Sequence, residues 1–214
     1  MALSLYGYHY SVYVRAVRLA LAEKELRCEQ IEVDPFSPLP EGYLDLHPFG
    51  RVPVLRHGRL MLYETQAILR YLDERFPGPP LQPDGAAARA RMMQVMGIAD
   101  AYAYRPLVRQ VYSHAVFRPA AGEASDPREV AMGMVAAARV LGALEVLAEE
   151  GLVLSGAVTL ADLHLAPMIA AFAQAAEGAA AVARHPALAA WWQGMRGRES
   201  MAETDPGLPE GRLR

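Results

Sequence analysis

The segment that most constrains the fold covers residues 49–76, FGRVPVLRHGRLMLYETQAILRYLDERF. Two short apolar runs, residues 52–55 and 60–63, are joined across His57 and Gly58, and glycine adopts the positive φ that tight hairpin turns require. The residues that follow repeat with the spacing of a helix lying on a sheet, namely Thr65, Ile68, Leu69, Leu72 and Phe76. The segment therefore predicts two antiparallel strands and a helix, which ends at the proline-rich residues 77–80.

Two positions in this unit indicate a binding site. Because Pro53 cannot donate a hydrogen bond, Val52 before it keeps backbone groups free to pair with an extended peptide. Glu64 and Thr65 stand where the helix begins, and the unpaired N–H groups there attract a carboxylate. Each feature alone is also explained by ordinary structure, a proline at a strand start and a plain helix N-terminus. Together they predict a site for a peptide-like, acidic ligand.

Composition excludes several other classes of protein. A formal net charge of -3 over 214 residues gives no electrostatic case for nucleic-acid binding. Cys28 is the only cysteine, and neither His9 nor His47 has a partner at ligand spacing, so we expect no disulfide and no metal. The first residues lack the pattern of a signal peptide, and no apolar run approaches a membrane span. We expect a soluble cytoplasmic protein without a membrane partner.

The first 78 residues alternate between strand and helix patterns. A strand over residues 3–6 is followed by a helix that Ser11 caps, with Val14 and Val17 facing inward and Arg15 and Arg18 facing outward. A second strand follows over residues 28–33, and an irregular proline-rich loop leads into the hairpin. This order predicts an α/β domain over residues 1–78 with a mixed four-stranded sheet of the thioredoxin-like kind.

After residue 86 the periodicity is helical throughout. We expect helices over residues 86–116, from Asp126 to Gly151, from Thr159 onward and over residues 186–195. Thr159 and Asp162 have the spacing of a capping box. The chain therefore divides into residues 1–78, a linker over 79–85 and an all-α domain over 86–214.

The order of these features resembles the cytosolic glutathione S-transferase (GST) superfamily over essentially the whole chain. The resemblance is carried by Val52-Pro53, then Glu64-Thr65, then Thr159 to Asp162 in a helical second domain. Residues 11–17, SVYVRAV, resemble the serine loop of bacterial theta- and zeta-like classes. The resemblance implies the GST fold, a homodimer, and glutathione as co-substrate.

The same resemblance implies roles for the binding residues. The valine matching Val52, before a cis proline matching Pro53, pairs with the cysteinyl part of glutathione. Glu64 would take the ammonium of the γ-glutamyl end and Thr65 its carboxylate. Threonine departs from the usual serine but keeps the hydroxyl. Arg51 is placed near the glycyl carboxylate, although a solvated surface arginine explains it equally well.

Ser11 is the expected catalytic residue. The family's serine stabilises the glutathione thiolate by donating a hydrogen bond, which lowers the pKa of the thiol. An N-cap role is the alternative, and the two roles are compatible. Tyr8 and Tyr10 rank second as thiol donors, and Tyr13 lies close by. We expect all three tyrosines to line the substrate site.

The second substrate is expected in the cleft between the domains. On the first long helix, a stripe of two cations between two rings faces either the cleft or solvent: Tyr102, Arg105, Arg109 and Tyr112. A stripe facing the cleft favours an electrophile with an acidic or aromatic part. We assign Tyr102 and Arg105 to the binding site for this second substrate. Asp100 and Tyr104 lie on the other side of this helix, and Asp100 matches a region where family members send an acid toward glutathione.

Two functions follow from these features. The first is an enzyme that conjugates glutathione to a small electrophile, or uses it in isomerisation or dehalogenation, in detoxification or as a step in a catabolic pathway. The second is a non-catalytic protein that binds glutathione or another ligand on the same scaffold.

Overall fold

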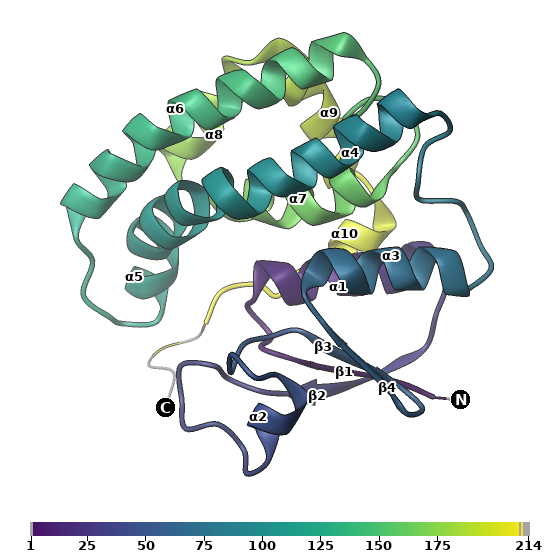
Figure 1. Cartoon of the computed structure of the whole chain (residues 1–214). Coiled ribbons are helices and arrows are strands. Elements are labelled where there is room, and N and C mark those ends of the chain that lie inside the picture. Colours follow the sequence, from purple (N-terminus) through teal and green to yellow (C-terminus); the bar gives the residue numbers. More distant parts are fainter. Residues whose placement is uncertain (1, 210, 212–214) are drawn as a thin grey trace.

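The computed structural model describes residues 2–209 and residue 211, and Figure 1 shows a small sheet beneath a larger group of helices. The first part of the chain consists of β1 (Leu3–Gly7), α1 (Val12–Glu23), β2 (Cys28–Glu32), α2 (Tyr43–Leu46), β3 (Val54–His57), β4 (Leu60–Tyr63) and α3 (Thr65–Arg75). Helices α1 and α3 lie between the sheet and the other helices, whereas α2 lies on the opposite side of the sheet (Figure 1). The predicted thioredoxin-like arrangement is confirmed.

The sheet has four strands in the order β2-β1-β3-β4. β1 runs parallel to β2, with Leu3 opposite Cys28, and antiparallel to β3, with Leu5 opposite Leu55. Gly58 turns the β3–β4 hairpin with a φ of 62°. β3 begins at Val54, two residues later than the strand predicted over residues 52–55. Val52 and Pro53 lie outside the hydrogen-bonded ladder of the sheet, because proline has no N–H group to donate to it.

One prediction for α1 is wrong. Arg15, expected to face outward, is only 6% exposed, and its Nη2 donates to the carbonyl oxygen of Met201 at 2.9 Å. An amphipathic helix on a sheet normally has a solvent-exposed outer face, but α7 and α10 pack on the outer side of α1. The helix is therefore covered on two sides, which its sequence pattern does not reveal.

The rest of the chain is helical. It consists of α4 (Ala86–Ile98), the π-helix η1 (Ala99–Phe117), α5 (Arg118–Ala120), α6 (Pro127–Glu150), α7 (Leu160–Phe172), α8 (Ala176–Ala183), α9 (Pro186–Arg196) and α10 (Glu199–Glu203). The predicted caps are present: the Asp126 carboxylate accepts from Arg128 N–H at 2.8 Å, Gly151 ends α6 with a φ of 75°, and Thr159 N–H donates to Asp162 at 2.7 Å. The short helices α5, α8 and α10 lie in the part of the chain predicted to be helical but were not predicted as separate helices.

The long helix expected over residues 86–116 changes its winding part-way. From Ala99 to Phe117 it is a π-helix, with Pro106 inside it. A proline removes one N–H from the helical ladder, and π-helical segments have i→i+5 hydrogen bonds that wind more widely than the 3.6 residues per turn of an α-helix. This change alters which side chains share a face of η1.

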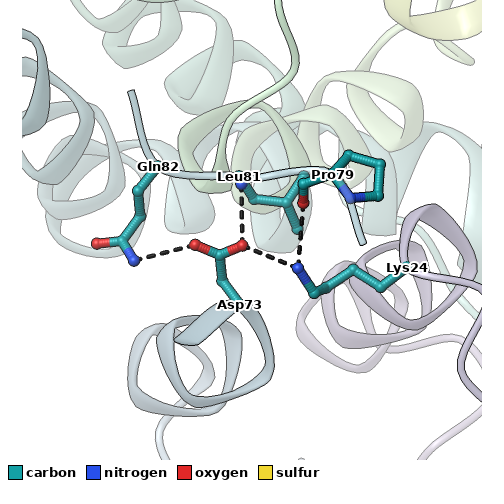
Figure 2. Close-up of polar contacts among 5 residues, drawn as sticks. All are labelled: Lys24, Asp73, Pro79, Leu81 and Gln82. Atoms are coloured by element: carbon teal, nitrogen blue, oxygen red, sulfur yellow. Dashed lines mark hydrogen bonds and ion pairs between the residues drawn. The ribbon is translucent and has the colours of Figure 1, made fainter. Parts of the chain in front are cut away.

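The linker between the two parts is held by a buried ion pair (Figure 2). Lys24, at the C-cap of α1, and Asp73 of α3 meet at 3.0 Å, with side chains only 1% and 7% exposed. The Asp73 carboxylate also accepts from Leu81 N–H at 2.9 Å and from Gln82 at 3.0 Å, while Lys24 donates to the Pro79 carbonyl oxygen at 3.1 Å. The Leu81 carbonyl oxygen in turn accepts from Leu160 N–H at 2.8 Å, at the start of α7. The linker is thus tied to both parts of the molecule.

The hydrophobic core is continuous across the two parts. One cluster of buried side chains includes Leu5 and Leu55 of the sheet, Leu72 of α3, Leu107 of η1 and Phe172 of α7. Helix α6 is long and apolar enough to cross a membrane by length and composition, because an 18-residue window within it has a mean hydropathy of 1.8. It packs against η1 and α9.

Candidate active site

A cavity of about 910 Å³ opens between the sheet and η1. Five segments line it: the loop from β1 into α1 with the first turn of α1, the loop after β2, the loop before β3, the beginning of α3, and one face of η1. Of the residues predicted from sequence, the cavity brings together Tyr8, Tyr10, Ser11, Tyr13, Arg51, Val52, Pro53, Glu64 and Thr65. These residues come from separate stretches of the chain, so only the folded structure makes one site of them.

The loop before β3 presents free backbone to the cavity. The Val52–Pro53 peptide bond is cis, as the family resemblance implied. Among the described residues, neither the N–H nor the C=O of Val52 is hydrogen-bonded to another group of the chain. An extended peptide lying along this edge would find both a donor and an acceptor at one residue.

The beginning of α3 forms the second binding element. The first intrahelical bond joins Ile68 N–H to the Glu64 carbonyl oxygen at 3.0 Å, so the N–H groups of residues 65–67 have no partner within the helix. Thr65 is 6% exposed and lines the cavity beside them. Glu64 has a φ of 69°, which costs a non-glycine residue about 1–3 kcal/mol and is concentrated at functional sites. This geometry suits a carboxylate on the helix N-terminus and a cation on Glu64.

Asp100 of η1 adds a second carboxylate at this end of the cavity. It accepts from Gln66 Nε2 at 2.7 Å, and its other oxygen lies 2.7 Å from Nε2 of the buried His164 on α7. Burial alone would raise the pKa of Asp100, but hydrogen bonds from His164, Gln66 and Tyr13 lower it. Asp100 is therefore ionised and held in one orientation, and it can share a bound ammonium group with Glu64.

Arg51 and His47 lie beside Val52 in the loop before β3. The Arg51 side chain is exposed at the cavity edge, and its carbonyl oxygen accepts from the buried Tyr43 hydroxyl at 2.8 Å. His47 is 3% exposed, with its ring 4.8 Å from that of Tyr63. Burial lowers the pKa of His47, so it is neutral at pH 7 and Arg51 is the cation here. His9, by contrast, lies outside the cavity lining, with Nε2 3.2 Å from the Pro206 carbonyl oxygen.

Ser11 both caps α1 and faces the cavity. Its Oγ accepts from Val14 N–H at 3.3 Å, which uses a lone pair of the hydroxyl. Among the described residues the hydroxyl proton has no acceptor, so it is free to donate to a ligand atom. The N-cap role and the role of hydrogen-bond donor therefore use different parts of the same group.

The neighbouring tyrosines are less suited to stabilising an anion. Burial and the nearby acids Asp34 and Glu32 raise the pKa of Tyr8. Burial and the charge of Asp100 likewise raise the pKa of Tyr13. Tyr10 packs edge-on against Tyr8 and Phe117, with ring centroids 5.6 and 5.2 Å apart. These rings form walls of the cavity.

Comparisons with known proteins bear directly on this site. A family profile described as "Glutathione S-transferase, N-terminal domain" matches residues 5–80, and one described as "Glutathione S-transferase, C-terminal domain" matches residues 106–199. The chain belongs to the glutathione S-transferase family. Glutathione S-transferase 3 of Zea mays is 30% identical, covering 97% of this chain and 95% of its own length.

Solved structures agree with this assignment. The apo form of a glutathione S-transferase III is 29% identical and superposes with a TM-score of 0.83, covering 95% of each chain. A theta-class glutathione S-transferase of Xanthomonas axonopodis pv. citri, with glutathione bound, is 25% identical with a TM-score of 0.78, covering 95% of this chain and 96% of its own. Because relatives matching the whole chain include plant phi-class enzymes, the comparisons do not single out the expected bacterial theta- or zeta-like class.

In this glutathione S-transferase the side of the cavity formed by η1, where the electrophile was expected, differs from the sequence prediction. Tyr102 and Arg105 do not line it, and Tyr102 is 66% exposed to solvent. The residues of η1 that do line it are Asp100, Tyr104, Val108, Arg109, Tyr112, Ser113 and Phe117. Within this set, residues 100, 104, 108 and 112 and residues 109, 113 and 117 recur every four residues, in rows that the wider winding of a π-helix keeps on one face, whereas the prediction assumed α-helical spacing. Pro106, inside the segment predicted as a continuous helix, was the one residue in the sequence that could have indicated this change of winding.

Other cavity residues had no signal in the sequence. Pro35 and Phe36 reach the cavity from the loop after β2, and Phe49 and Gly50 from the loop before β3. Such loop positions follow no periodicity. In the part of the chain that the structure describes, no three His, Cys, Asp or Glu side chains are grouped to hold a metal ion.

Proposed function

We propose that this protein binds glutathione in the cavity, stabilises its thiolate, and directs the sulfur to a small electrophile in a conjugation reaction or in a glutathione-assisted isomerisation or dehalogenation. The observation that carries the proposal is that Ser11, Val52 and Thr65 line the same cavity. A free hydroxyl donor, a free peptide edge and an open helix N-terminus are the three contacts that an acidic peptide thiol needs.

The charges of the cavity match those of glutathione. Its two carboxylates would bind at the N-terminus of α3 with Thr65 and at Arg51, and its ammonium would bind between Glu64 and Asp100. Its cysteinyl backbone would pair with Val52. Each charged group of the tripeptide then faces an opposite charge or a positive helix end, which keeps the ligand extended with its thiol toward Ser11.

Ser11 would act on the thiol through its hydroxyl proton. A thiolate that accepts a hydrogen bond at the N-terminus of α1 is stabilised relative to the thiol, so the pKa of the bound thiol falls. The thiolate is the nucleophile, and Ser11 itself forms no bond to the substrate.

A protein that binds without catalysis is the second candidate, because this fold hosts both kinds of function. The test has two steps: retention on immobilised glutathione, then conjugation of 1-chloro-2,4-dinitrobenzene. Retention with turnover supports the enzyme. Retention without turnover, over several electrophiles, supports the binding protein, and loss of both contradicts glutathione as the ligand.

Three further expectations remain proposals. The class within the family, including the theta- or zeta-like one, is open to a test of thiol donors by variants of Ser11, Tyr8 and Tyr10. Dimerisation is supported by the exposed apolar side chains of Phe49, 70% exposed, and Tyr102, and analytical ultracentrifugation measures it. A cytoplasmic location and a role in detoxification are consistent with this activity and await localisation and gene-deletion experiments.

A further inference from the structure

Arg109 is the one cation of the cavity that glutathione leaves without a counter-charge. Among the described residues lining the cavity, the charged side chains are Arg51, Glu64, Asp100 and Arg109. In the binding mode proposed above, glutathione engages the first three. Arg109 has no ion pair or hydrogen bond with any described residue, and its guanidinium lies over the Phe36 ring, 5.2 Å from the centroid.

The acids whose charges act on Tyr8 and Tyr112 at this end of the cavity already accept hydrogen bonds or pair with other groups. One of them, Asp205, accepts from Gly207 N–H at 3.0 Å. Asp34 accepts from Phe36 N–H at 2.9 Å and from the Ser37 hydroxyl at 2.7 Å. Glu32 accepts from His9 N–H at 3.0 Å, and Glu123 is paired with Arg118 at 3.4 Å. None of these acids lines the cavity, so none occupies the space in front of Arg109.

The walls around Arg109 are flat and aromatic. The ring centroid of Phe36 lies 5.8 Å from that of Tyr8, and the ring centroid of Phe117 lies 5.2 Å from that of Tyr10 and 5.9 Å from that of Tyr112. Burial and the nearby Asp205 raise the pKa of Tyr112 to about 12, so this wall is uncharged at pH 7. Aromatic walls favour a planar apolar ring, and a lone guanidinium at their edge favours a carboxylate on that ring.

We propose that the electrophile of this enzyme is an aromatic compound carrying an anionic substituent, and that Arg109 is the residue that selects it. The inference rests on the proposed function. In a model reaction with 4-fluoro-3-nitrobenzoate, the thiolate sulfur bonds to the ring carbon that carries fluorine. The carbon–fluorine bond then breaks, fluoride leaves with its electron pair, and the thiol proton has already passed to solvent.

The test compares this carboxylate with its neutral analogue, 4-fluoro-3-nitrobenzamide. Each kcat/KM is divided by the rate of free glutathione with the same compound, which removes the difference in intrinsic reactivity. The variants are Arg109→Gln, Arg109→Lys and Arg105→Gln, a matched control because Arg105 lies on η1 outside the cavity lining. For Arg109→Gln we expect a loss of about two- to fivefold with the carboxylate, the order of magnitude of an exposed ion pair, and less than about 1.5-fold with the amide, because Arg109 is exposed to solvent. Arg109→Lys should keep part of the preference, and Arg105→Gln should keep all of it.

Several results would overturn the inference. Equal losses with both compounds would mean that Arg109 only positions Phe36, and a raised KM for glutathione alone would mean that it binds the tripeptide. No change in either compound would mean that it does neither.

A binding measurement separates this inference from the proposed function. Calorimetry with the two glutathione conjugates, one carboxylate and one amide, needs no turnover. Tighter binding of the carboxylate conjugate that Arg109→Gln abolishes supports the inference even if catalysis fails. Equal binding of the two conjugates contradicts it even if catalysis succeeds.

Discussion

Replacing Asp73 with asparagine should destabilise the protein more than any exposed charge change. The asparagine side chain has nearly the same shape, but it would leave the Lys24 ammonium, with a side chain 1% exposed, without its counter-charge. Removing one partner of a buried ion pair costs about 3–5 kcal/mol, because the remaining charge stays buried. A chain of this length loses roughly 2–4 °C of Tm per kcal/mol, so we expect Asp73→Asn to lower Tm by about 6–20 °C.

Thermal unfolding followed by circular dichroism at pH 7.5 measures this loss. The matched control is Arg70→Gln, which breaks an ion pair with Glu74 on the same helix whose side chains are 63% and 52% exposed. Exposed pairs of this kind contribute about 0.3–0.5 kcal/mol, so Tm should fall by no more than about 2 °C. A double variant, Lys24→Met with Asp73→Asn, should recover part of the loss because no unpaired charge remains.

The pH dependence gives a second, independent check. Burial would raise the pKa of Asp73, but Gln82, Leu81 and Lys24 together lower it below its ordinary value of 3.8. A lowered pKa in the folded state means that the stabilisation is complete above pH 3.8 and is lost as the pH falls through the folded-state value. The difference in unfolding free energy between wild type and Asp73→Asn should therefore shrink at acidic pH. A variant within about 2 °C of wild type, or a difference independent of pH, would refute the reasoning.

Three more predictions concern the site and the helical domain. Ser11→Ala should lower kcat/KM for an aryl halide about 10- to 100-fold and raise the thiol pKa of bound glutathione, measured by thiolate absorbance against pH, while Ser155→Ala, in an exposed segment after α6 and outside the cavity lining, should do neither. Thr65→Val should raise the KM for glutathione about tenfold with little change in kcat, and Thr65→Ser should restore it; a fall in kcat alone would contradict a binding role. Asp162→Ala should lower the unfolding free energy by about 2–4 kcal/mol in urea, because it removes the bond from Trp191 Nε1 at 2.6 Å together with the cap of α7; a loss below about 1 kcal/mol would contradict this.

The glutathione half of the site was predictable because it depends on local features. The roles of Pro53 before a strand and Thr65 at a helix N-terminus follow from the residue itself and its immediate neighbours in sequence. The same is true of the caps at Asp126 and Thr159, which the structure confirms. The division of the chain at residues 78 and 86 stays a prediction.

The electrophile half was not predictable in the same way. Its residues on η1 depend on the helix winding, and α-helical spacing placed Tyr102 and Arg105 where the π-helix places Tyr104 and Val108. Phe36 reaches the cavity from an irregular loop, whose course follows no repeating pattern. Arg15 was misplaced for a related reason, since the pattern of one helix does not show what packs on its other face.

The sequence by itself determined the order of the four strands and the longer helices and the caps of α1, α6 and α7, because periodicity and the positions of proline and glycine act over a few residues. The order of its motifs carried the resemblance to the family. The tertiary structure alone decided which side chains meet across the cleft, that Asp100 is held by His164, and that Arg109 is left without a counter-charge. These depend on contacts between residues far apart in the chain, such as Asp100 and His164 at a separation of 64, and local patterns carry no information about such contacts.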